Sequence, residues 1–307
     1  QIVEAYEDYM AALFRAYYDW YEAYENVRTA RNAYEQSMSL LENIEARRRS
    51  NIALEIDVNK VRLQALQKRE NLMTTESLYA GRVSEIARAI RAGESGRLVP
   101  VAPSVYAQVD EPFAELYEAF TSASRTVRVL SLLEKTAVGL SQRYAWELLP
   151  SIALTAGLTH KGDGRDLADS ERAARAGISI EWPLPGKQER ARYETARIEA
   201  ERTRLNTLSV QARLKRDLET VYAQIVTARG QLAIADERIA LAEAILKDEQ
   251  VNYSYGKVSL NDLIKVVNDL EDQKFSRINH SVRLRSLTIE WLRLTDSLVT
   301  RDSPDKL

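Results

Sequence analysis

The chain has 307 residues, of which 29% are charged, and a formal net charge of −2 at pH 7. It contains no cysteine, which excludes disulfides, thiolate metal sites and a lipidated cysteine within it. The near balance of charge argues against a nucleic-acid partner, which usually needs a basic stripe. With only 11 Gly and 7 Pro, the chain is expected to be mainly helical.

Residues 1–95 predict a long helical hairpin. Apolar residues recur three or four positions apart from Leu13 through Trp20 and Val27 to Leu41, which is the spacing of a coiled-coil seam. Asn51 then interrupts the pattern, and Asn readily adopts the left-handed backbone conformation that ends a helix. A second helix is therefore expected to return from this turn.

The next segments are a linker at 96–110 and a helix of about 36 residues within 111–148 that leads to two strands. Pro100 and Pro103 lie in the linker, so a helix cannot continue through it. The linker and this helix separate the first hairpin from the rest of the chain.

Residues 149–186 predict a β-hairpin, with a polar loop at 160–175 between its strands. In each strand the large apolar residues lie an even number of positions apart, which places them on one face. They are Ile152, Leu154 and Leu158 in the first strand and Ile178, Ile180, Trp182 and Leu184 in the second. Because one hairpin alone is marginally stable in water, it needs a partner sheet or a bilayer.

Residues 187–300 predict a second helical hairpin, followed by a tail at 301–307. Its apolar seam runs for more than four heptads from Leu214 to Leu246, and a helix of roughly 70 residues spans about 100 Å. Gly256 interrupts the pattern, and a further helix is expected from about 259 to 298.

The two hairpins are related by an internal duplication with an offset of 205 residues. This offset places Trp20 on Ile225, and it places Asn51 on Gly256. An internal repeat of this kind indicates how the whole chain is organised. The strand pair precedes the second hairpin, so its counterpart is expected before Gln1, and the chain is interpreted as an N-terminally truncated form of a longer protein.

Three short motifs resemble the TolC-like outer-membrane efflux protein family. They are Leu149-Pro150-Ser151-Ile152, Ile180-Glu181-Trp182-Pro183-Leu184 and the helical turn at 253–263. The order of the duplicated hairpins around the strands also matches. The resemblance implies a mainly α fold in which two coiled-coil hairpins form part of a trimeric α-barrel and the β-hairpin contributes to an outer-membrane β-barrel.

The resemblance also implies a function. The homotrimer would be a passive export duct of a tripartite efflux or type I secretion system, reaching from the outer membrane into the periplasm. Its helical tip would open when a periplasmic adaptor and an inner-membrane pump dock, and it would have neither enzymatic activity nor a cofactor. The residues agree with a barrel, because a sheet crosses a bilayer only when it is closed, and strands of about 10 residues with one apolar face suit it.

The candidate pore and gate residues lie just past the two turns. Asp57 and Asp262 are equivalent in the repeat, and carboxylate rings constrict cation channels; the alternative is an acid that favours a helix start. The resemblance also places Tyr253 and Asp57 where the family has closed-state gate contacts between the two hairpins. It also shows two departures: Val258 replaces a gate arginine, and Lys265, three residues after Asp262, replaces a second aspartate.

The turns themselves are a candidate adaptor-docking surface, and simple turn packing is the alternative. The residues assigned to this surface are Asn51, Ala53, Leu54, Gly256, Val258, Ser259 and Leu260. Trp182, at a strand end, is a candidate for an aromatic belt at the membrane interface. The two histidines, His160 and His280, form no ligand motif, so no metal site is expected.

Two other functions remain open from sequence alone. A periplasmic adaptor also contains a long helical hairpin, but it would need Gly-rich lipoyl-type half-motifs flanking a single hairpin. A cytosolic coiled-coil scaffold would leave the strands at 152–158 and 178–184 unexplained.

Overall fold

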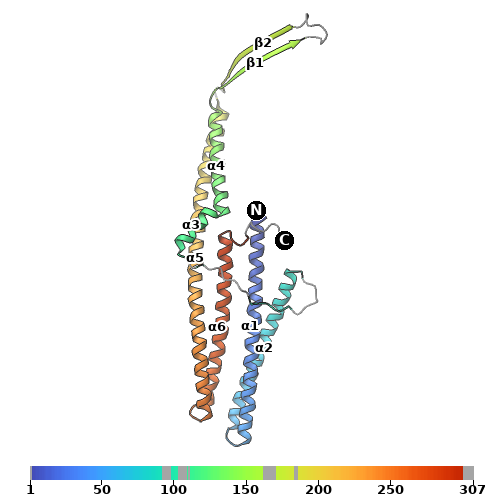
Figure 1. Cartoon of the computed structure of the whole chain (residues 1–307), viewed down its shortest axis with the longest axis vertical. Helices are drawn as coiled ribbons and strands as arrows, with labels where there is room; N and C mark the ends of the chain where they lie inside the picture. The colour runs from blue at the N-terminus through green and yellow to red at the C-terminus, as the bar shows by residue number, and fades with distance from the viewer. Residues whose placement is uncertain are drawn as a thin grey trace. The chain divides into compact units, whose positions relative to one another are not determined.

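The computed structural model describes residues 2–91, 98–102, 109, 111–161, 171–182 and 186–299. It is mainly helical, with one β-hairpin (Figure 1), as the sequence predicts. In chain order the elements are α1 (Ile2–Arg49), α2 (Glu55–Ala89), α3 (Phe113–Ala123), α4 (Arg125–Trp146), β1 (Ser151–Lys161), β2 (Glu171–Glu181), α5 (Lys187–Ser254) and α6 (Leu260–Leu294). The chain forms two compact units, Gln1–Phe120 with Arg216–Leu307 and Thr121–Lys215.

The duplication is visible in the helices of the first unit. Helices α2 and α6 each have 35 residues, and both of their ends are offset by 205 positions. The backbone that follows these two helices is also equivalent. Arg91 after α2 and Asp296 after α6 both have a positive φ, of 51° and 56°. The offset read from the sequence therefore holds from the turns to the helix ends.

Both turns end the preceding helix in the same way. Asn51 has φ 58° and Gly256 has φ 71°, as predicted from their tolerance of the left-handed conformation. In each turn the amide one residue later donates to the carbonyl five residues before it, which is the Schellman arrangement. These bonds measure 2.9 Å from Ile52 to Arg47 and 3.0 Å from Lys257 to Asn252.

The apolar seams lie inside the first unit. Helix α1 contacts both α2 and α6, and in Figure 1 the two hairpins turn at the same end of this unit. The buried seam residues are Trp20, Val27, Ala30 and Leu41 in α1 and Leu218, Val221, Ile225, Ala228 and Ala235 in α5. A helix that buries such a stripe gains most of its stability from that packing.

The linker is held by hydroxyl groups of the helices. Tyr79 of α2 donates to the Leu98 carbonyl at 3.1 Å, and Tyr222 of α5 donates to the carbonyl of Glu111, directly after the linker, at 3.2 Å. Pro100 lies in a described, non-helical stretch, whereas Pro103 and the tail at 301–307 lie outside the described residues.

The prediction of one helix across 111–148 is wrong. Helix α3 ends at Ala123, and α4 begins after Ser124, whose backbone is extended (φ −60°, ψ 131°). The Ser124 hydroxyl accepts a hydrogen bond from the Val127 amide at 3.2 Å. Serine is among the preferred N-cap residues because its side chain satisfies an amide that a helix start leaves unpaired.

The β-hairpin of the second unit is longer than predicted at its loop end. Strand β2 begins at Glu171 rather than near 176, and β1 and β2 pair antiparallel along their whole length. The register places Ile152 opposite Ile180 and Leu154 opposite Ile178, so the large apolar side chains share one face, as predicted. Leu184 and the Pro183 of the family motif lie outside the described residues.

Candidate functional site

The two hairpins share an apolar core next to their turns. We call it the tip core, and it consists of Leu41, Ile44, Val58, Val61 and Leu260. Four of these residues come from the first hairpin, whereas Leu260 is the first residue of α6. Partly buried Tyr253 and Ile264 of the second hairpin also pack against it. The turns of both hairpins are therefore held together by apolar contacts.

A cation–π contact joins the hairpins beside the tip core. The guanidinium carbon of Arg47 on α1 lies 5.0 Å from the centre of the Tyr253 ring on α5. Contacts of this kind contribute about 0.5–2 kcal/mol, depending on burial. Tyr253 thus makes a contact between the hairpins, with Arg47 as its partner, while Asp57 accepts a hydrogen bond from the Leu54 amide in its own turn at 3.3 Å.

Asp262 caps the start of α6. Its carboxylate accepts from the Ser259 hydroxyl at 2.6 Å and from the Ser259 amide at 3.2 Å, and the Ser259 hydroxyl accepts from the Asp262 amide at 3.2 Å. These hydrogen bonds, together with the nearby charge of Lys265, lower the pKa of Asp262. This exposed carboxylate is therefore negatively charged at neutral pH, as a pore ring and a helix cap would both require.

The equivalent cap in the first hairpin is incomplete. Leu54 occupies the position of Ser259, and a leucine side chain has no acceptor, so only the Asp57 half of the reciprocal arrangement is present. We expect Leu54→Ser to stabilise the protein by about 1 kcal/mol, because it supplies the missing N-cap acceptor. Urea unfolding followed by circular dichroism measures this change.

The matched control for this prediction is Ser259→Leu, which removes the acceptor from the second hairpin and should destabilise by a similar amount. An unchanged or lower stability in Leu54→Ser would contradict the predicted cap.

The predicted docking residues differ in accessibility. Asn51, Leu54, Gly256 and Ser259 are exposed, whereas Ala53 and Val258 are half-buried. Leu260 is only 6% exposed and belongs to the tip core. The Leu260 side chain therefore lies outside the exposed surface of the turns, because it packs in a cluster with residues of the first hairpin.

Polar residues that the sequence analysis did not identify lie between the hairpins above the tip core. The Gln64 side-chain amide of α2 donates to Asn268 of α6 at 3.4 Å, and Lys68 of α2 forms an ion pair with Glu271 of α6. The signal was present in the sequence. Lys68 takes the next seam position after Val58, Val61 and Ala65, where an apolar residue is expected.

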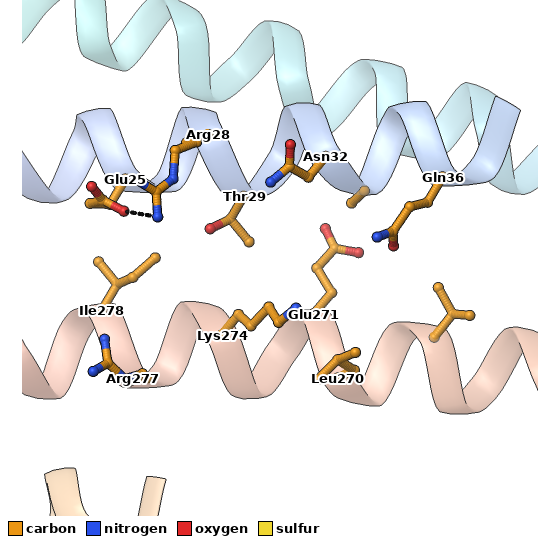
Figure 2. Close-up of a pocket in the computed structure, with 12 residues that line it drawn as sticks. Glu25, Arg28, Thr29, Asn32, Gln36, Leu270, Glu271, Lys274, Arg277 and Ile278 are labelled. Carbon is orange, nitrogen blue, oxygen red and sulfur yellow. Dashed lines mark ion pairs between the residues drawn. The ribbon is translucent and has the colours of Figure 1, made fainter. Parts of the chain in front are cut away.

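Next to this ion pair, a polar cavity of about 240 Å³ lies between α1 and α6. Figure 2 shows Glu271 pointing from α6 toward α1, with Lys274 beside it and Asn32 and Gln36 on the opposite helix. Arg28 and Glu25, at the other end of the cavity, form an ion pair at 3.1 Å. Polar walls of this kind favour water over an apolar ligand.

Two helices of the first unit carry a second apolar stripe that is exposed. On α2 it consists of Leu63, Leu66 and Met73, opposite the buried residues of that helix. On α5 it consists of Val226, Ile234, Leu241 and Ile245, opposite the buried seam. Exposed apolar stripes on helices are typical of interaction surfaces.

The β-hairpin exposes its entire apolar face. Ile152, Leu154, Leu158, Ile178 and Ile180 are each at least 67% exposed, and Trp182 is 60% exposed. Within the described residues the sheet has two strands, so each strand also has an unpaired edge. An uncovered apolar face with open edges is a site for pairing with further strands.

The described residues contain no group of three or more side chains placed to bind a metal ion. A search of the described helices likewise found none that is long and apolar enough to span a bilayer.

This architecture is similar to that of known proteins. A family model described as "Outer membrane efflux protein" matches residues 144–298, while a search of curated proteins found no match. The outer-membrane channel OprN is similar in fold, with 14% identity, a TM-score of 0.69, and coverage of 96% of this chain and 67% of that one.

Two further solved structures are similar. The outer membrane protein VceC from Vibrio cholerae has 14% identity and a TM-score of 0.68, and the match covers 95% of this chain and 71% of that one. The MtrE outer membrane channel of Neisseria gonorrhoeae, solved in its open state, has 14% identity and a TM-score of 0.65, with coverage of 96% and 68%. At these identities the likeness establishes a shared fold.

Proposed function

Because the chain belongs to the outer membrane efflux protein family, we propose that it is a subunit of a homotrimeric outer-membrane duct in a tripartite efflux or type I secretion system. The duct is passive and catalyses no reaction. Family membership favours this function over the periplasmic adaptor and the cytosolic scaffold.

The observation that carries this proposal is the exposed apolar face of the β-hairpin. Its large side chains lie on one face with small and polar residues on the other, such as Ala153 opposite Ser179 and Thr155 opposite Gly177. Lipid covers such a face only if every strand edge is paired, which requires a closed barrel. One hairpin cannot close a barrel, so further strands, including those of other subunits, complete it, with Trp182 at the membrane interface.

The second apolar stripes of α2 and α5 support a ring of subunits. Each of these helices buries one apolar face within the chain and exposes another. If the stripe on α2 packs against the stripe on α5 of the next copy, two different surfaces meet, and the contact is heterologous. Heterologous contacts close into a ring when the rotation from one subunit to the next divides a full turn evenly. A trimer of such subunits forms the α-barrel tunnel.

The turns of the hairpins form the gated and docking end of the duct. The contacts that hold the two hairpins together there, Arg47 with Tyr253 and the tip core, have to change when the tip opens. The exposed turn residues Asn51, Leu54, Gly256 and Ser259 are the surface for a periplasmic adaptor that couples the duct to an inner-membrane pump.

Charge reversal at Asp262 tests the pore assignment. In a trimer this exposed carboxylate recurs three times around the tip, and a ring of carboxylates attracts cations. We expect Asp262→Lys to reduce the preference of the full-length protein for cations, and the reversal potential of planar bilayers under a salt gradient measures this preference.

Glu199→Lys is the control, since it reverses an exposed charge on α5 that lies far along that helix from the turn. An unchanged reversal potential in Asp262→Lys would leave Asp262 as a helix cap alone. Absence of any conductance in the unaltered protein would overturn the duct itself.

A further inference from the structure

We propose that the buried ion pair between Lys68 of α2 and Glu271 of α6 holds the two hairpins together above the tip core and separates when the tip opens. We call it the inter-hairpin ion pair. The proposal rests on the duct function proposed above, because parting of the hairpins is what opens such a tip. It assigns a conformational role to two residues that lie away from the turns.

The inter-hairpin ion pair is unusually well shielded from solvent. The Lys68 side chain is 16% exposed and the Glu271 side chain is 6% exposed. Other ion pairs have a more exposed partner: Arg31 and Glu76 within the first hairpin are 56% and 44% exposed. Arg15 and Glu290, which also join the two hairpins, are 49% and 25% exposed. Burial removes the water that would otherwise screen and replace the partner charge.

A second polar contact lies one helical turn closer to the tip. Gln64 precedes Lys68 by four residues and Asn268 precedes Glu271 by three, so both contacts lie on the same faces of α2 and α6. The Gln64 to Asn268 hydrogen bond is 3.4 Å long. The two contacts together fix how α2 is aligned along α6, because polar partners lose their bonds when one helix slides, whereas apolar contacts tolerate small shifts.

The position of the pair along the seam gives it its role. Toward the turns lies the apolar tip core, and away from them lies the polar cavity, which Glu271 also lines (Figure 2). Farther from the turns, a second apolar cluster between α1 and α6 contains Ala11, Tyr18, Val282 and Ile289. The ion pair therefore lies where the apolar tip core gives way to the polar cavity.

Removing one partner should part the hairpins. A buried charge that loses its counterion is strongly destabilising, whereas replacing both charges by apolar groups of similar size is often neutral. Lys68→Met strands the Glu271 carboxylate, and the hairpins can hydrate it by moving apart. Lys68→Met with Glu271→Leu leaves no stranded charge, so the hairpins should stay together.

Spin labels on the two turns measure this movement. The chain has no cysteine, so cysteines at Ile52 and Lys257, which are exposed and lie one in each turn, give unique labels. The full-length protein is labelled, diluted with unlabelled protein before assembly, and examined in detergent by double electron–electron resonance. We expect Lys68→Met to raise the population of long distances at least about tenfold and the double variant to restore the original distribution.

Two further variants complete the test. Arg31→Met removes an exposed ion pair within the first hairpin and should leave the distances unchanged. Exchanging the charges, as Lys68→Glu with Glu271→Lys, should keep the hairpins together if the double apolar variant does not fold. An unchanged distribution in Lys68→Met, or long distances that persist in a folded double variant, would overturn the role of the pair.

Bilayer conductance separates this proposal from the duct function. If the unaltered protein conducts and Lys68→Met does not change the distances, the ion pair has no such role and the duct function stands. If the unaltered protein does not conduct, the duct function falls, whatever the labels report.

Discussion

Replacing Leu63 and Leu66 together by glutamate is expected to abolish the proposed trimer. Both residues are more than half exposed and lie on the second apolar stripe of α2, which would be covered by the neighbouring subunit in the proposed ring. A glutamate buried there without a partner costs several kcal/mol in desolvation. Two such changes, repeated at three interfaces, should shift the protein to monomers, which light scattering in detergent detects as a threefold lower mass.

The matched control is the replacement of the same two residues by methionine. It keeps the stripe apolar and changes the side-chain volume little, which packed interfaces usually tolerate. This variant should remain trimeric. A trimer that persists in the double glutamate variant would show that α2 does not face another subunit, and it would remove the stripe as support for the ring.

Replacing Ile44 by alanine is expected to destabilise the protein by roughly 2–5 kcal/mol, the usual loss for a buried isoleucine. Ile44 is completely buried in the tip core, where residues of both hairpins meet. The cavity left behind cannot close easily, because Val58, Val61 and Leu260 are held by their own helices. Urea unfolding of the detergent-solubilised protein, followed by circular dichroism, gives the change in free energy.

The control for Ile44 is Ile52→Ala in the adjacent turn. Ile52 is 69% exposed, so the same loss of side-chain atoms should change the stability by no more than about 0.5 kcal/mol. Equal losses in the two variants would mean that the tip core does not hold the hairpins together.

The sequence alone determined the hairpins, their turns and the duplication. Each of these depends on local signals: a heptad seam decides which face of a helix is apolar, and Asn51 and Gly256 tolerate the left-handed conformation that ends one. The alternation of Ile152 and Leu154 with small residues likewise decided the faces of the strands. The split of the helix before β1 also has a local cause, since Ser124 is a strong N-cap residue, although one continuous helix was predicted there.

Only the tertiary structure decided which residues of the tip are covered and which polar residues meet. Leu260 looks like a turn residue in the sequence, but it is buried because it packs against Leu41 and Ile44, more than 200 residues earlier. The partners Lys68 and Glu271 are also more than 200 residues apart. Periodicity shows which face of a helix is buried, but it does not show which residues of another helix lie opposite that face. That choice depends on how the side chains of the two hairpins pack together, which is a property of the folded chain.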